Sequence, residues 1–145
     1  MKSAAAYQRF GRVFVTAEEG TDFGTREALP VMEVTGLPYH LLGRAVLFAL
    51  DAYREAPKKP TVNPNAISPL HLLAGVKNWT KFADGAKCVE VTQHDRSIVL
   101  TPMRYEVLQG GHAPISEKEI VIERDELSIG SSLARAFGAG ESLSE

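Results

Sequence analysis

The side chains best suited to chemistry in this sequence are three neighbouring residues in one short polar segment. His94, Asp95 and Arg96 bring together a base, an acid and a cation, a set that a small hydrolase could use. Adjacent residues in a tight turn point away from one another, however, and a polar turn is also what two paired strands need between them. We therefore expect a hairpin tip here, and a small hydrolase that uses His94 or His112 is the alternative.

A group of glutamates offers a second kind of chemistry. Glu117, Glu119 and Glu123 alternate on or near one predicted strand and would share a face of it. A metal site would need ligands from other elements as well. The histidines have none of the spacings of a zinc site, and they are His40, His71, His94 and His112. We expect no metal and no cofactor, and we interpret the glutamates as a solvent-facing acidic strip that could contact a basic partner.

The rest of the chain has no catalytic or nucleotide-binding motif. It contains no glycine-rich phosphate loop followed by Lys-Ser or Lys-Thr, no dinucleotide fingerprint and no Gly-x-Ser-x-Gly elbow. The single cysteine, Cys88, lies in an apolar stretch, where a buried thiol is the common outcome. These observations predict a binding protein and not an enzyme.

The hydrophobic pattern predicts the elements that position these residues. Strands are predicted at 10–17, 29–34, 88–92, 97–108 and 119–123. Two main helices are predicted, at 39–55 and over the segment that ends near residue 137. A turn is predicted at 18–22, and a proline-rich long loop at 56–69.

Length and composition predict one domain. The chain has 145 residues, of which 44% are apolar and 23% charged, as in an ordinary globular domain. The predicted fold is α+β, with a mostly antiparallel sheet of about five strands, two main helices and the proline-rich loop. We expect a single domain over residues 1–140 and a flexible tail at 141–145.

Two segments of the chain echo each other when Gly43 is aligned with Gly130. Apolar residues stand at matching positions one before the glycine and three, six and seven after it. Each segment also follows a predicted strand, so both are interpreted as a strand that turns into a short helix with the same buried face. We expect the glycine in each first turn to let the helix lie close against the sheet.

Charge is unevenly distributed along the chain. The net charge of −2 excludes a basic protein held to nucleic acid by bulk electrostatics. Residues 97–145 contain eight acidic and four basic side chains, a local charge of −4, which favours a basic partner. The lone cysteine gives no sign of an oxidising compartment. Neither a secretory signal pattern nor an apolar run of about 20 residues occurs, so we expect a cytoplasmic protein without a membrane segment.

Two blocks of the sequence carry the motifs of a known family. In residues 36–54, Leu-Gly opens a helix that ends in an aromatic residue followed by arginine. Residues 89–110 contain a Thr-Pro-x-Arg-x-Glu segment after a strand, and an Ile-Gly-x-x-Leu helix follows at 129–133. The chain departs from the pattern at Gly111-His112, where a tryptophan is expected. With these motifs the sequence resembles the immunity proteins of bacterial contact-dependent growth-inhibition (CDI) systems.

The resemblance implies a protein that binds the C-terminal toxin domain delivered by a neighbouring cell and blocks it in the cytosol of the producing bacterium. Such toxins are often nucleases, whose clefts tend to be basic because they bind phosphates. Acidic side chains are therefore the candidate toxin contacts. The first group is Glu117, Glu119, Glu123, Asp125 and Glu126, and the second is an exposed acidic loop with Glu18, Glu19 and Asp22.

A nucleic-acid-binding module is the remaining alternative. Its basic path would consist of Lys58, Lys59, Lys77, Lys81 and Lys87. Trp79 or Phe82 would then serve as a stacking platform for bases. We expect these aromatics to serve the core instead, and we expect no direct contact with nucleic acid.

Overall fold

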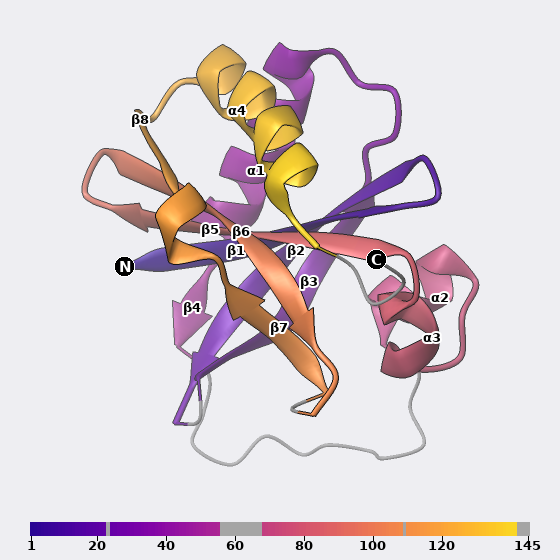
Figure 1. Ribbon diagram of the computed structural model, residues 1–145. Coiled ribbons are helices and arrows are strands. Elements are labelled where there is room, and N and C mark those ends of the chain that lie inside the picture. The colour runs from indigo at the N-terminus through magenta and orange to yellow at the C-terminus, as the bar shows by residue number, and fades with distance from the viewer. Residues whose placement is uncertain (23, 56–67, 109, 142–145) are drawn as a thin grey trace.

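The computed structural model describes residues 1–22, 24–55, 68–108 and 110–141. Apart from its last two residues, the predicted proline-rich loop lies outside the described residues, as does the predicted tail beyond residue 141. In chain order the elements are β1 (Lys2–Arg9), β2 (Arg12–Thr21), β3 (Gly24–Glu33), α1 (Tyr39–Asp51), β4 (Arg54–Glu55), α2 (Pro69–Ala74), α3 (Trp79–Ala83), β5 (Ala86–His94), β6 (Ser97–Glu106), β7 (Gly111–Pro114), the 3-10 turn η1 (Ser116–Lys118), β8 (Ile120–Glu123) and α4 (Glu126–Ala139) (Figure 1).

The strands form one sheet that is mostly antiparallel. Six of them follow the order β3-β2-β1-β5-β6-β7, while β4 pairs with β2 and β8 pairs with β6. Among the described strands, only the short pairing of β4 with β2 is parallel. The predicted α+β class and antiparallel sheet are confirmed, as are the two main helices, although α1 ends at Asp51 and not at residue 55 because β4 pairs with β2 there. The predicted count of about five strands is wrong, because the described residues form a sheet of eight.

The central strand β1 is the main element that the hydrophobic pattern fails to predict. Its middle consists of Ala4, Ala5 and Ala6, and alanine is depleted in strands because it offers little side chain to pack. β1 nevertheless pairs with β2 on one side and with β5 on the other over most of its length. All three alanines are buried. Pairing with two neighbours, and not intrinsic propensity, therefore makes this segment a strand.

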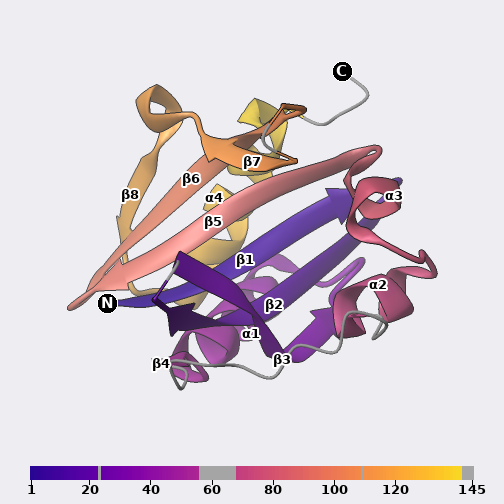
Figure 2. The same ribbon diagram turned by 90° about the horizontal axis from the view of Figure 1, so that it is seen from below.

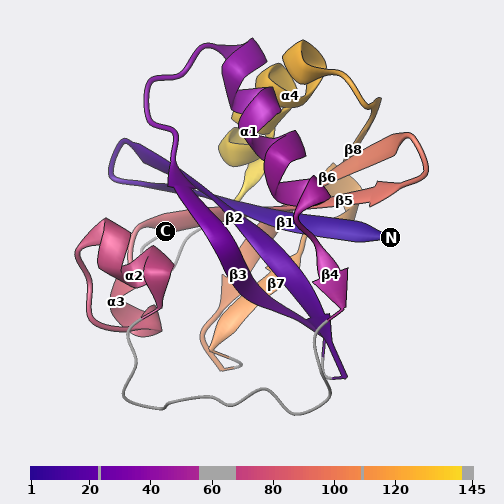
Figure 3. The same cartoon turned by 180° about the vertical axis from the view of Figure 1, so that it is seen from behind.

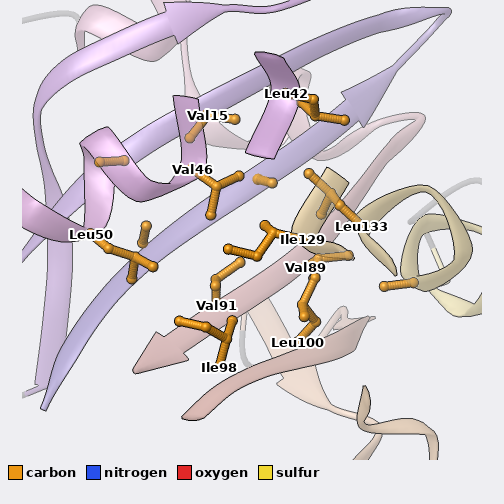
Figure 4. Close-up of a cluster of buried hydrophobic side chains, with 14 of the residues drawn as sticks. Val15, Leu42, Val46, Leu50, Val89, Val91, Ile98, Leu100, Ile129 and Leu133 are labelled. Carbon is orange, nitrogen blue, oxygen red and sulfur yellow. The ribbon is translucent and has the colours of Figure 1, made fainter. Parts of the chain in front are cut away.

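Helices α1 and α4 lie side by side across one face of the sheet (Figures 1 and 3). Aliphatic side chains of both helices meet those of β2, β5 and β6 in the main core (Figure 4). Val46, Leu50, Ile129 and Leu133 are fully buried there. Burial of each such side chain contributes roughly 1.5–3 kcal/mol, so this layer is the main source of stability.

Each of the two helices places a glycine against the first turn of the other. A Cβ on Gly43 would overlap the carbonyl group of Glu126, the first residue of α4. A Cβ on Gly130 would overlap the carbonyl group of Tyr39, the first residue of α1. The contact is reciprocal, as the internal echo suggests, but the expectation that each glycine faces the sheet is wrong. The missing side chains let the two helix backbones touch.

The short helices α2 and α3 pack on the opposite face, at one end of the sheet (Figure 2). Leu70 of α2 and Phe82 of α3 form a second buried cluster with Phe14 of β2. The rest of this face is not covered by α1 or α4, and its side chains include several polar groups. No helix in the described part of the chain is long and apolar enough to span a membrane.

Candidate functional site

The first three predicted contact residues lie along the edge of the sheet that β8 forms. Glu117 is in η1, Glu119 follows it, and Glu123 ends β8 opposite Ser97 of β6. All three glutamates are exposed. Glu119 also accepts a hydrogen bond from the Thr101 hydroxyl at 3.3 Å. The structure thus gathers three carboxylates at one accessible edge, as an acidic contact surface requires.

Asp125 and Glu126, the other members of this group, have intramolecular roles. The Asp125 carboxylate caps α4 by accepting a hydrogen bond from the Ser128 backbone at 2.8 Å, and this bond lowers the pKa of the carboxyl. Glu126 forms an ion pair with Arg44 of α1 at 3.3 Å. A partner that contacted either residue would compete with the contacts that fix the start of α4.

The second group of predicted residues does not form an exposed acidic loop, and that prediction is wrong. Glu18 and Glu19 belong to β2, which runs on to Thr21 because β3 pairs with it there. Glu18 is only 7% exposed. Glu19 forms an ion pair with Arg26 of β3. Asp22 alone is exposed, in the turn after β2.

Glu18 instead lies on the face of the sheet that α1 and α4 leave uncovered. Side chains alternate along a strand, so residues 16 and 18 of β2 point away from the helices. On β5 the same face carries Glu90, because Ala5 of β1 pairs with Thr16 on one side and with Glu90 on the other. Ser3 of β1 shares this face and is 1% exposed. The small side chain of Ala5 leaves room for long side chains from both neighbouring strands.

The carboxyl groups of Glu18 and Glu90 contact each other across β1. Burial raises the pKa of Glu90 well above its ordinary value, and its hydrogen bond with Glu18 raises the pKa further. Oε2 of Glu18 lies 3.5 Å from the Thr25 hydroxyl. Oε1 of Glu18 and the Ser3 hydroxyl are buried without a hydrogen-bond partner. Two carboxyls in contact share a proton rather than both ionise. The pair is therefore acidic, and one of its buried oxygens lacks a hydrogen-bond partner.

An aromatic group closes one end of the same face. Tyr7 of β1 packs edge-on against Phe82, with ring centroids 5.2 Å apart, and Trp79 stacks on Phe82 at 5.7 Å. His112 of β7 packs edge-on against Trp79 at 5.6 Å. Burial lowers the pKa of His112 to about 4, although a hydrogen bond with the backbone of Ala86 opposes the shift. Phe82 is therefore buried and Trp79 packs half-buried against it, so both aromatics serve the core, as predicted.

The structure places only some of the lysines proposed for nucleic-acid binding close to one another. Lys77 and Lys81 line a hollow of about 380 Å³ with Arg9, whose guanidinium donates hydrogen bonds to the carbonyls of Lys81 and Phe82. Lys87 lies on β5. Lys58 and Lys59 lie outside the described residues.

The residues of the hydrolase alternative lie in two separate places. His94 ends β5 and pairs with Ser97 across the turn of Asp95 and Arg96, which confirms the predicted hairpin tip. Asp95 has a positive φ of 56°, a conformation that asparagine and aspartate tolerate in tight turns. His112 lies in the aromatic group described above, where it contacts the rings of Tyr7, Trp79 and Tyr105 and the backbone of Ala86. No group of three or more metal-ligating side chains occurs within the described ranges.

The sequence pattern missed Ser3 and Glu90 as members of a site. The only local signal at Glu90 is its place in a strand of alternating polar and apolar residues. That pattern predicts an ordinary charged side chain that faces solvent. That this face is partly covered, and that Glu18 reaches the same place, follows from the pairing of β1 between β2 and β5.

Comparison with known proteins finds similarity of fold but not of sequence. No family model and no curated protein matches the sequence. The structure is similar to the protein of unknown function NMB0488 from Neisseria meningitidis, with a TM-score of 0.76 and 15% identity over 96% of this chain and 94% of that one. It is also similar to a chain of the CdiA-CT/CdiI toxin and immunity complex from Yersinia pseudotuberculosis, with a TM-score of 0.71 and 15% identity over 96% of this chain and 97% of that one. At this identity the likeness shows a shared fold.

Proposed function

We propose that this chain is an immunity protein that binds and neutralises the toxin domain of a CDI system in the cytoplasm of the producing bacterium. The observation that carries the proposal is the fold shared with a chain of the CdiA-CT/CdiI toxin and immunity complex, over nearly the full length of both chains. The motifs around Gly43 and Gly130 support it, because they resemble CDI immunity proteins and the structure uses both glycines in one helix contact.

The arrangement of acidic side chains supports a basic partner, and we propose a nuclease toxin. Glu117, Glu119 and Glu123 stand exposed at one edge of the sheet, and complementary charge would speed association and set the register of the complex. A nuclease that binds phosphates offers the matching basic surface. The role is binding and occlusion, so no catalysis by this chain is required.

The direct test is binding to the toxin domain encoded immediately upstream of the gene for this chain. We expect a complex with a Kd in the nanomolar range or below, as for other tight protein inhibitors, and loss of toxin nuclease activity at equimolar ratio. Calorimetry and a nuclease assay measure the two effects. A toxin domain that stays active with excess of this protein would contradict the proposal.

Charge reversal separates the acidic-contact model from the immunity role itself. The variant E117K/E123K should weaken the complex by about tenfold or more and reduce its salt dependence, because exposed interface charges mainly govern association. His94→Gln, at the exposed hairpin tip, is the matched control. Unchanged affinity of the double variant would refute the acidic contact and leave the immunity role to be judged by the wild-type complex.

A further inference from the structure

The sheet face opposite α1 and α4 contains a group of polar side chains that we call the acid site, defined as the buried Ser3 and Glu18 and the half-buried Glu90. They come from three adjacent strands, β1, β2 and β5, and the two carboxyls hydrogen-bond each other. Glu18 is 7% and Ser3 1% exposed. Oε1 of Glu18 and Oγ of Ser3 have no hydrogen-bond partner although both are buried. Leaving a buried polar atom without a hydrogen-bond partner is unfavourable, so the acid site is incomplete as it stands.

More acidic and titratable groups border the acid site, and they lie on or next to β1, β3, β4 and β5. Glu27 of β3 accepts a hydrogen bond from the Leu70 backbone at 2.9 Å, and Glu55 of β4 accepts one from the Tyr53 hydroxyl at 3.0 Å. The phenol of Tyr7 and the thiol of Cys88 interact electrostatically with Glu18 and Glu90, and burial raises the pKa of both groups. The titratable groups that face the acid site or its border are therefore Tyr7, Glu18, Glu27, Tyr53, Glu55, Cys88 and Glu90.

The ion pairs of the described residues lie away from the acid site. Within the described residues, the ion pairs join Lys2 and Arg124 to Asp51, Arg12 to Glu33, Arg26 to Glu19, Arg44 to Glu126 and Arg104 to Glu141. None of these pairs includes Glu18, Glu27, Glu55 or Glu90.

We infer that the acid site receives the ammonium or guanidinium group of a lysine or arginine side chain of the bound toxin domain, which is an inference that rests on the proposed function. Both groups carry several N–H donors and no acceptor, so they match the two carboxyls and the Ser3 hydroxyl, whose free atoms can all accept. Glu90 and Thr92 of β5 are only half-buried, which makes the β5 side the route of entry. When the cation binds, the proton shared by Glu18 and Glu90 leaves to solvent, so charge remains balanced.

The first test uses small cations and does not depend on a toxin. Methylguanidinium and n-butylammonium are titrated into the wild-type protein at neutral pH, and the side-chain carboxyl carbons of all glutamates are followed by NMR. The resonances of Glu18 and Glu90 should shift saturably, while that of exposed Glu123 should drift without saturation. Loss of the saturable shift in both E18Q and E90Q would support the acid site. Equal responses at Glu123 and Glu90 would overturn the inference.

The second test uses the complex with the upstream-encoded toxin domain. Calorimetry in two buffers with different heats of ionisation should show release of about one proton on binding by wild type, and none by E90Q. E90Q should also weaken the complex by about thirtyfold or more, since removing one partner of a buried charge pair has an effect of that size. E123Q, which removes an exposed carboxylate of the same type, should leave the proton release intact.

The outcomes separate this inference from the proposed function. If the toxin domain binds E18Q and E90Q as tightly as wild type, the acid site does not receive a cation, and the immunity role stands. If the toxin domain binds neither the wild type nor any variant, the immunity role fails. The methylguanidinium titration then decides whether the acid site binds cations. Glutamine is nearly isosteric with glutamate, and thermal unfolding of each variant confirms that it is folded.

Discussion

The two faces of the sheet are built on opposite principles. The face under α1 and α4 is apolar, and its helices approach so closely that Gly43 and Gly130 touch backbone. The other face combines an aromatic group at one end with Glu18 and Glu90, whose acidic groups contact each other. The first face is packed from apolar side chains, whereas the second contains buried polar atoms that have no hydrogen-bond partner. The difference indicates that the helical face maintains the fold, and our proposal assigns binding to the other face.

The largest effect is expected from filling the contact between the helices. Gly43→Ala or Gly130→Ala places a methyl group inside van der Waals contact with a rigid backbone carbonyl, so the helices must separate. We expect each change to lower the free energy of unfolding by about 3 kcal/mol or more, at the upper end for overpacked cores. Chemical denaturation measures the loss.

Gly138, in the same helix α4, provides the matched control for this prediction. A Cβ there meets no atom within 4 Å, so Gly138→Ala should be neutral or stabilising by up to about 1 kcal/mol through helix propensity. A Gly43→Ala protein as stable as Gly138→Ala would show that the helices need not touch.

Acid should weaken the second face through His112. Its pKa is about 4 in the folded protein and 6.5 in the unfolded chain, so the unfolded state binds the extra proton first as the pH falls. The stability that His112 contributes is complete above pH 6.5 and is lost between pH 6.5 and about 4. We expect the free energy of unfolding to fall by about 2 kcal/mol over this range, allowing for the partial exposure of His112. Unfolding by denaturant across this range should show the loss in wild type and in His94→Gln, and not in His112→Phe.

Base should weaken the same face through Glu90, with the opposite sign. Its pKa is raised in the folded state above the ordinary 4.5, so the folded protein holds a proton that the unfolded chain releases. Stability from this group is therefore full below pH 4.5 and falls as the pH rises towards the folded pKa. Glu90→Gln should remove that decline and stabilise the free protein near neutral pH by about 1 kcal/mol. Melting temperatures at acidic and neutral pH check this, and a variant that melts lower than wild type at neutral pH would argue against a strained acid pair.

The smallest effect on stability is expected at the exposed acidic edge. Glu117→Lys and Glu123→Lys change residues outside both buried regions, so each should alter the free energy of unfolding by no more than about 0.5 kcal/mol. Their expected effect is on toxin binding. A large loss of stability would mean that this edge is part of the fold and not a surface left for a partner.

The sequence predicts the helical face better than the other face for a physical reason. The apolar period of the segment after Tyr39 and the Asp125 cap are local signals, and the structure confirms both helices. The strand β1 has no such signal, because its alanines become a strand only between two partners. The error at residues 18–22 has the same origin, since β3 extends β2 through a segment rich in acidic residues.

By itself, the sequence determined that the two main helices form, which of their faces are buried, and that Gly43 and Gly130 occupy equivalent places, because these properties depend on neighbours along the chain. Only the tertiary structure decided what each glycine touches and that Ser3, Glu18 and Glu90 meet in one acid site. Strand β1 lies between two strands that are far apart in the sequence, and its pairing brings their carboxyls together. The burial of Glu18, which a local pattern assigns to solvent, is therefore a consequence of that pairing.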